Sequence, residues 1–133
     1  MKYLLDTNVC IKFLSGWEPK LSAKFAAIAA PDKLLCAVVK AELYYGGYKS
    51  QQQQTTLTTL EHFFARFISL PFDDRAAEVF GEIRAALFSK GTPIGPYDMQ
   101  VAAIAIANDV TLVTHNVKEF SRVNRLRIED WEA

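Results

Sequence analysis

The chain has 133 residues, half of them hydrophobic and 23% charged, and its 15 basic and 15 acidic side chains cancel to a net charge of zero. This length and composition are typical of one globular domain, residues 1–133, and exclude a disordered chain. The neutral balance does not indicate a nucleic-acid partner, so any such partner would have to be bound by a local patch of the surface.

Two further features concern the compartment. Asp6 interrupts the N-terminal apolar run too early for a signal peptide, and no apolar stretch reaches the roughly 18 residues of a membrane span. Cys10 and Cys36 lack the spacing of a metal motif or a C-x-x-C pair, so we expect buried thiols in a reducing compartment. We therefore expect a cytoplasmic protein without a membrane segment.

Strand-like and helix-like segments alternate along the chain. The first is a short apolar strand, residues 3–5, which runs into Asp6 and is followed by a helix over residues 9–14. Further strands are predicted over residues 33–37, 68–70, 111–114 and 126–128. Further helices are predicted over residues 20–30, 38–48, 55–67, from a cap at Asp73 to beyond Leu87, over 97–108, and as a single turn at 117–120.

This alternation predicts the α/β class. Strands that alternate with helices form a parallel sheet with helices on both faces, so we expect a three-layer α/β/α domain with a central, mainly parallel sheet of four to five strands. Right-handed crossovers place the carboxyl ends of all the strands along one edge. Ligands of open α/β folds bind at that edge, which makes polar residues there candidates for a site.

Three acids from separate segments fall at or near that edge, and each has an ordinary alternative explanation. Asp6 follows the first strand directly, where an Asp is usually only a helix cap. Glu42 shares a helix face with Val38 and Val39, unless the helix register is wrong by one residue and it faces solvent. Asp98 lies in the first turn of an otherwise apolar helix, where it can simply favour the helix dipole.

Two oxygen-bearing residues follow the strand at 111–114. Asn116 and Glu119 both offer ligand atoms close to the strand end, although turn formation explains Asn116 and a solvated helix face explains Glu119. Clustered carboxylates raise one another's pKa, and hard oxygen ligands are those that Mg²⁺ or Mn²⁺ requires. Carboxylate-held metals can activate water in phosphodiester cleavage. No Ser/His/Asp set, Walker loop or dinucleotide-binding glycine motif competes with this interpretation.

Four motifs stand in order along nearly the whole chain. They are Leu4-Leu5-Asp6-Thr7-Asn8, Ala41-Glu42-Leu43 with Gly46, Ile94-Gly95-Pro96-Tyr97-Asp98 with its Ala-rich helix, and Thr114-x-Asn116 with Phe120. Each motif alone is short, but the ordered set resembles the PIN-domain nucleases, and within them the VapC toxins of bacterial toxin–antitoxin pairs.

The resemblance implies a Mg²⁺-dependent endoribonuclease, with Mn²⁺ as the alternative ion, that often acts on tRNA. It further implies a homodimer, inhibition by a VapB-type antitoxin, and binding of operator DNA only through that antitoxin. Asp6, Glu42 and Asp98 match the family's metal-binding acids. Our hypothesis for their roles is that Asp6 bridges or centres the metal site, that Asp98 is a direct ligand, and that Glu42 holds the metal or its water. Asn116 then orients the water.

The fourth position departs from the family pattern. Many members carry Asp at the third position of Thr-x-Asp, and this chain has Asn116 there. Asn can bind a metal or a metal-bound water but adds no charge, so either Glu119 takes over or three acids suffice. The number of metal ions therefore stays open.

RNA must also be bound. Phosphate contacts from basic side chains give salt-dependent affinity without sequence choice, although scattered solubilising charge explains any single one. The other candidates are His115, which is more simply a turn residue, and the core-like Phe63, Phe64 and Phe67. The basic candidates are Lys118, Arg122, Arg125 and Arg127 near the C-terminus, with Lys40, Lys49, Arg84 and Lys90.

Two other classes of function compete. Haloacid-dehalogenase-type phosphatases also begin with a strand and an Asp, but they require a second acid two residues later, where this chain has Asn8. A non-catalytic RNA- or protein-binding module that kept the fold is the other alternative, and the presence of three acids argues against it.

Overall fold

The computed structural model describes all 133 residues, and its strands and helices alternate as the sequence predicts. The five strands are β1 (Tyr3–Leu5), β2 (Lys33–Cys36), β3 (Ile68–Leu70), β4 (Thr111–Val113) and β5 (Ile128–Glu129). The helices are α1 (Thr7–Ser15), α2 (Pro19–Ala27), α3 (Ala37–Tyr48), α4 (Gln53–Phe64), α5 (Asp74–Ser89), α6 (Pro96–Ala107) and α7 (Val117–Phe120), with a 3-10 turn, η1, at Ala30–Asp32.

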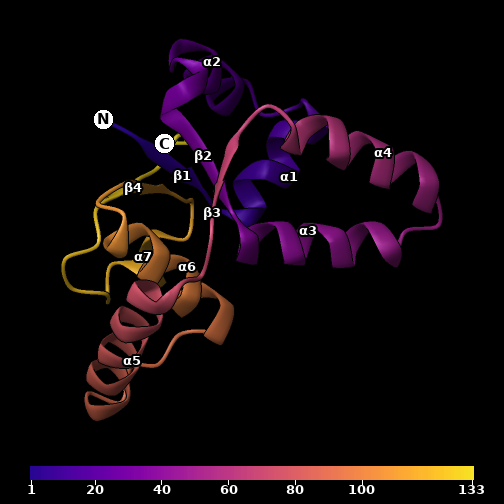
Figure 1. The fold of residues 1–133 in the computed structure, drawn as a ribbon. Coiled ribbons are helices and arrows are strands. Elements are labelled where there is room, and N and C mark those ends of the chain that lie inside the picture. The colour runs from indigo at the N-terminus through magenta and orange to yellow at the C-terminus, as the bar shows by residue number, and fades with distance from the viewer.

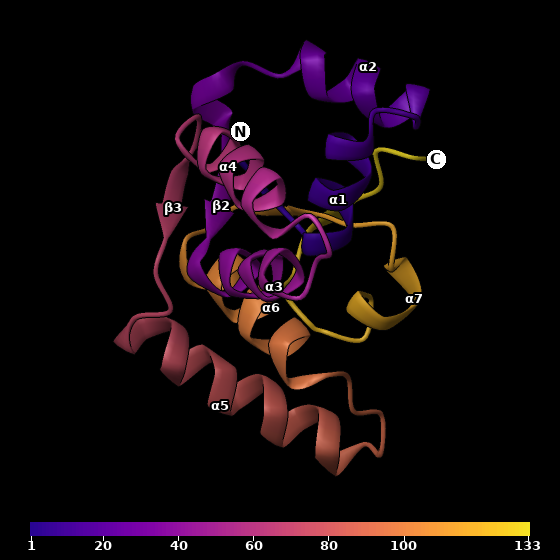
Figure 2. The ribbon, with the colours of Figure 1, turned by 90° about the vertical axis from the view of Figure 1, so that its right-hand side faces the viewer.

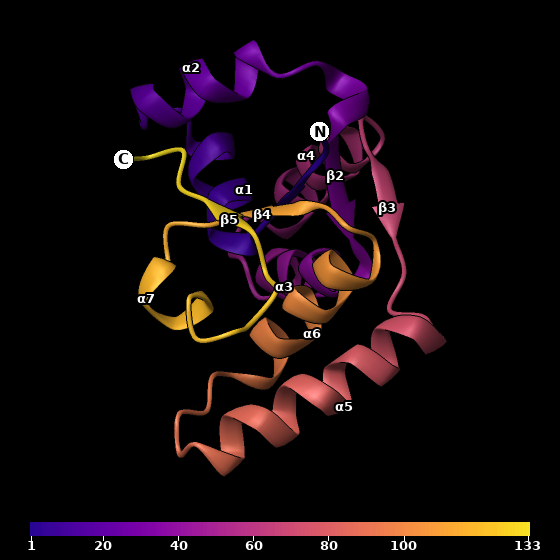
Figure 3. The ribbon, with the colours of Figure 1, turned by 90° about the vertical axis from the view of Figure 1, so that its left-hand side faces the viewer.

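All five strands are parallel and lie in the order β3-β2-β1-β4-β5. The chain therefore moves outward from β1 to β2 and β3, crosses back, and continues through β4 to β5. Right-handed crossovers in these two directions place α1 to α4 on one face of the sheet and α5 to α7 on the other. Figure 1 shows α1, α3 and α4 on one side of the strands and α5, α6 and α7 on the other. Figure 3 shows β4 and β5 toward one side of the sheet and β2 and β3 toward the other. The predicted three-layer architecture is confirmed.

The differences from prediction lie at element ends. The helix predicted over residues 20–30 stops at Ala27, and the 3-10 turn that follows contains Pro31, which has no amide hydrogen for a helix interior. The helix predicted over 55–67 begins and ends earlier, at Gln53 and Phe64. The last strand is Ile128–Glu129 rather than 126–128, and the carbonyls of Arg127 and Glu129 accept from the Leu112 and Thr114 amides.

The core is one cluster of 32 buried residues. Helix α6 is buried from Val101 to Ala105, as its uniformly apolar sequence predicts. Cys10 and Cys36 are both buried and unbridged, as expected. No helix has the combination of length and apolarity that crossing a bilayer demands.

Helices α3 and α4 form a hairpin that projects from the body of the protein (Figures 1 and 2). The two helices approach each other at Gly47, where a Cβ atom would lie 2.8 Å from Cδ2 of Leu57 and 3.2 Å from Cδ1 of Leu60. The neighbouring Gly46 has no atom within 4 Å of the same position. Only Gly47 is therefore required by packing.

The two glycines give a matched test of this packing. Gly46→Ala should raise the free energy of unfolding by about 0.5–1 kcal/mol, because Ala is the better helix former. Gly47→Ala should be less stable than Gly46→Ala by roughly 1 kcal/mol or more, because Leu57 must move. Urea denaturation of both variants measures the difference. Equal stabilities would contradict the close approach of α3 and α4.

Candidate active site

The site lies where the strand order reverses. β1 and β4 are neighbours, and the chain leaves β1 toward β2 on one side and leaves β4 toward β5 on the other. Such a switch point opens a crevice at the carboxyl ends of the two central strands. Asp6 directly follows β1 and Thr114 directly follows β4, and the Asp6 amide donates to the Val113 carbonyl at 3.0 Å.

Asp6 is buried, with 7% of its surface exposed, and both of its carboxylate oxygens accept hydrogen bonds. Oδ1 accepts from the Thr7 amide at 2.8 Å, which caps α1, and Oδ2 accepts from the Thr114 hydroxyl at 2.9 Å. Burial raises the pKa of Asp6, the two hydrogen bonds oppose the rise, and the charge of Glu42 adds to it. Asp6 is thus a helix cap and also a carboxylate at the strand edge.

Glu42 lies in the second turn of α3 and is half-buried. Its Oε1 accepts a hydrogen bond from the Thr7 hydroxyl at 2.7 Å. The alternative in which a one-residue error in helix register turns Glu42 to solvent is therefore wrong. Thr7 links the two acids, because its amide binds Asp6 and its hydroxyl binds Glu42.

Asp98 lies half-buried in the first turn of α6. Its pKa is raised to about 6, first by burial and then by the negative charges of Asp6, Glu119 and Glu42. A charge can shift a pKa in this way only from nearby, so the fold gathers all four carboxylates into one electrostatic site. The helix dipole alone does not explain Asp98, since the dipole would lower rather than raise its pKa.

Asn116 and Glu119 act as a pair at the N-terminal turn of α7. The Asn116 amide group donates from Nδ2 to Oε2 of Glu119 at 3.0 Å, and the Asn116 backbone amide donates to the Thr114 hydroxyl at 3.0 Å. Asn116 is exposed and Glu119 is half-buried. The acid that sequence analysis left as an alternative therefore stands at the site, and the side chain of Asn116 holds it.

The donor set fits a hard divalent cation. Four carboxylates lie in one region, and hydrogen bonds from Thr7 and Thr114 orient Glu42 and Asp6. A bound cation would relieve the repulsion among the four negative charges. Their oxygens do not converge as tightly as a ligand shell, however. The group in which three residues bring ligand atoms within 4.8 Å of one another is a different one, His115, Asp130 and Glu132.

Two hollows meet over the first turns of α1, and both reach the acids. One, of about 330 Å³, is lined by Asp6, Asn8, Ile11, Lys12, His115 and Asn116. The other, of about 610 Å³, is lined by Thr7, Asn8, Ile11, Ala41, Glu42, Tyr45, Gly46, Lys49 and Tyr97. Asn8 and Ile11 belong to both, so the two hollows are adjacent.

Most of the predicted basic group is engaged elsewhere. Arg125 pairs with Glu82, Arg127 pairs with Asp109 at 2.9 Å, and Arg122 donates to the Pro93 carbonyl at 3.2 Å. Arg84 and Lys40 lie over the Phe88 and Phe64 rings. Of the eight basic residues, Lys49 alone lines either hollow beside the acids. Contact of the C-terminal basic residues with RNA therefore stays a prediction. Lys12, which sequence analysis did not single out, lines the smaller hollow and pairs with Glu132.

Comparison with known proteins decides the family. Residues 3–126 match the PIN domain. The chain belongs to the PIN-domain family. This PIN domain is 37% identical over 131 residues to the tRNA(fMet)-specific endonuclease VapC of Salmonella typhimurium and 34% identical over 133 residues to ribonuclease VapC2 of Rickettsia felis. These alignments cover 98% and 99% of both chains, respectively.

Solved structures agree with that assignment. The PIN domain superposes on a chain in the crystal structure of DNA-bound VapBC from Salmonella typhimurium with a TM-score of 0.92 over 98% of both chains. A chain of VapBC2 from Rickettsia felis, bound to a DNA fragment from its promoter, gives a TM-score of 0.90. The chain is therefore a member of the VapC group of PIN domains, as the motifs indicated.

The raised pKa of Asp98 predicts a pH-dependent cost in stability. Between the ordinary pKa of 3.8 and the folded value of about 6, the folded chain binds the Asp98 proton more tightly than the unfolded chain does. In metal-free buffer, the stabilisation that comes from this tighter proton binding should therefore be lost, and the free energy of unfolding should fall, as the pH rises from 3.8 to about 6.

The variant Asp98→Asn isolates the effect. At neutral pH its free energy of unfolding should exceed that of the wild type by about 1 kcal/mol, a value reduced because solvent reaches this half-buried group. The difference should disappear as the pH falls to the ordinary Asp pKa of 3.8, where Asp98 is protonated in the folded wild type. Urea unfolding across this range measures it. Identical pH profiles for the two proteins would contradict the shared site.

Proposed function

We propose that this chain is a Mg²⁺-dependent endoribonuclease, the toxin of a toxin–antitoxin pair, with Mn²⁺ as the alternative ion. The observation that carries the proposal is the gathering of Asp6, Glu42, Asp98 and Glu119 at the switch point of the sheet. The resemblance in sequence to VapC endonucleases over 98% of the chain supports it. We further propose that residues 1–133 act as a single catalytic domain.

Each residue has a role in the proposed mechanism. Asp6, Glu42 and Asp98 would hold the ion, and Asp6 is already oriented for this role because its two oxygens accept from Thr7 and Thr114. A bound Mg²⁺ supplies charge neutralisation at the scissile phosphate and lowers the pKa of a water molecule. Asn116 holds Glu119 and helps to orient the attacking water.

Glu119 compensates for the missing Asp at position 116. The amide group of Asn116 donates to Glu119 and adds no charge, while Glu119 brings the fourth carboxylate and raises the pKa of Asp98 more than Glu42 does. The site thus has the charge of a four-acid site, with the fourth acid three residues later in the chain.

The substrate class follows from the hollows that flank the acids. Tyr45 and Tyr97 are 67% and 58% exposed and line the larger hollow together with Lys49. Exposed aromatic rings beside a cation bind unpaired bases by stacking and phosphates by charge. We propose that a single-stranded stretch of tRNA crosses α1 through both hollows, in keeping with the tRNA(fMet)-specific name of the Salmonella relative.

The proposed partners follow the solved relatives. Those structures contain VapB-type antitoxins with VapC, and two include DNA. We propose that this chain is inhibited by its own VapB-type antitoxin, forms a homodimer, and reaches operator DNA only through the antitoxin. The haloacid-dehalogenase alternative has no support in the site, since Asn8 stands where its second acid is required.

Cleavage assays test the assignment. Asp98→Asn should reduce Mg²⁺-dependent cleavage of tRNA by more than about 100-fold, because removal even of outer-shell partners of a metal ligand costs about 10–100-fold. Thr114→Val, which removes the hydroxyl that donates to Asp6, should reduce cleavage by about 10–100-fold. The control is Glu78→Gln, an exposed acid of α5 that should cleave normally.

Folding of each variant is checked by circular dichroism. Cleavage by folded Asp98→Asn at the wild-type rate would reject the metal assignment. Absence of cleavage by the wild type with both Mg²⁺ and Mn²⁺ would instead favour the non-catalytic binding module.

The exposed tyrosines give a test of substrate binding. Tyr45→Ala or Tyr97→Ala should raise KM for RNA by roughly tenfold, since one stacked base contributes about 1–3 kcal/mol. The matched control is Tyr48→Ala, since Tyr48 is similarly exposed, at 62%, on the same helix as Tyr45 but lines neither hollow. An equal effect of all three substitutions would contradict a specific stacking site.

A further inference from the structure

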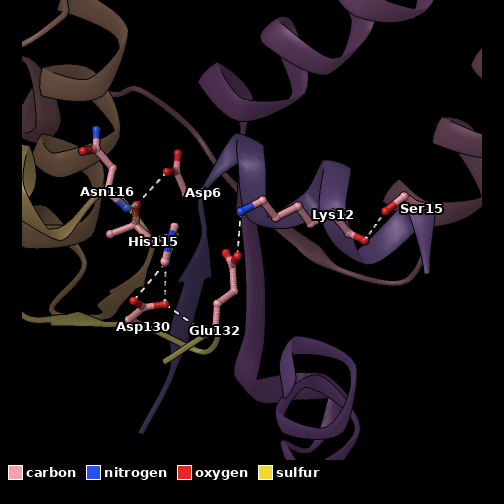
Figure 4. A network of polar contacts seen from close by, with 8 residues as sticks. Asp6, Lys12, Ser15, His115, Asn116, Asp130 and Glu132 are labelled. Atoms are coloured by element: carbon pink, nitrogen blue, oxygen red, sulfur yellow. Dashed lines mark hydrogen bonds and ion pairs between the residues drawn. The ribbon is translucent and has the colours of Figure 1, made fainter. Parts of the chain in front are cut away.

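A second group of ligand-type side chains lies beside the acids but does not include them. His115 follows β4, while Asp130 and Glu132 follow β5, so the parallel pairing of these strands brings the three together. One ligand atom from each lies within 4.8 Å of the other two. Figure 4 shows the three side chains close together below Asp6, with Glu132 beside the ammonium of Lys12.

The buried carboxylate of Glu132 is the feature of this group that indicates a cation-binding site. Its side chain is only 6% exposed, and Oε1 accepts from the Lys12 ammonium at 2.6 Å. The other oxygen, Oε2, is buried and has no hydrogen-bond partner. Figure 4 shows this carboxylate between Lys12 and the His115–Asp130 pair. A buried carboxylate oxygen without a partner is costly, and a cation removes that cost.

The other two ligands are already oriented. Oδ2 of Asp130 lies 3.0 Å from Nδ1 of His115, and Oδ1 accepts from the Glu132 amide at 2.9 Å. Two carboxylates and one ammonium leave one surplus negative charge beside the imidazole of His115. A cation bound between Asp130 and His115 would offset that charge.

We propose that His115, Asp130 and Glu132 form a second divalent-cation site, separate from the catalytic acids. One imidazole nitrogen with two carboxylate oxygens suits a borderline ion such as Zn²⁺, whereas Mg²⁺ prefers oxygen ligands alone. Lys12 stays on the far oxygen of Glu132 and keeps its carboxylate turned toward the other ligands. The site does not depend on nuclease activity, although His115 also lines the smaller hollow beside Asp6.

Calorimetric titration with Zn²⁺ tests the proposal, because the chain has one histidine inside the group and one outside it. His115 and His62 are both exposed, so substitution of either should leave the fold intact. His115→Gln should weaken Zn²⁺ binding by at least about tenfold, and Glu132→Gln should do the same. His62→Gln should bind Zn²⁺ as the wild type does.

The catalytic acids are the competing location for the ion, and Asp98→Asn separates the two. The Zn²⁺ binding that His115→Gln weakens should persist in Asp98→Asn. Equal affinity for His115→Gln and His62→Gln, or loss of all Zn²⁺ binding in Asp98→Asn, would overturn the second site. Neither outcome bears on RNA cleavage, whereas loss of cleavage in Asp98→Asn with Zn²⁺ binding intact supports both proposals.

Discussion

Burial of the Asp6 carboxylate between β1 and β4 is the constraint on which the site depends. A charged group at 7% exposure is stable only when its oxygens are bonded, and here the Thr7 amide and the Thr114 hydroxyl supply those bonds. The first donor is a backbone amide at the start of α1, and the second is a side-chain hydroxyl directly after β4. The orientation of Asp6 is therefore set by the sheet itself rather than by a flexible loop.

The other acids lie near Asp6 in the same arrangement, and their negative charges repel it. Glu42 reaches the same region through the Thr7 hydroxyl, and Asp98 takes up a pKa of about 6 because burial and three negative neighbours disfavour its charge. The folded chain thus holds together carboxylates that repel one another. This repulsion weakens the metal-free protein and makes a divalent cation favourable, so the same charges reduce stability and create the capacity to bind.

The sequence predicted the strands, the layers and the three acids, because these depend on local patterns and on the rule that parallel strands end at one edge. It could not choose between a solvent-facing and an inward Glu42, since the register of a helix is decided by packing. Nor could it show that Arg125 and Arg127 are bound to Glu82 and Asp109, which lie 43 and 18 residues away. Pairs this distant leave no periodic signal in the sequence.

The C-terminal segment also makes contacts that the sequence pattern could not predict. Trp131 is buried, packs edge-on against Tyr3 at 5.3 Å, and donates from its indole to Glu129 at 2.8 Å. This anchor fixes β5 beside β4, and the residues on either side of Trp131 are carried to the carboxyl edge of the sheet with it. Asp130 and Glu132 flank this buried residue, and their side chains contact His115 and Lys12. An apolar anchor and a polar group thus alternate along the same short segment, and neither is visible as a periodic pattern in the sequence.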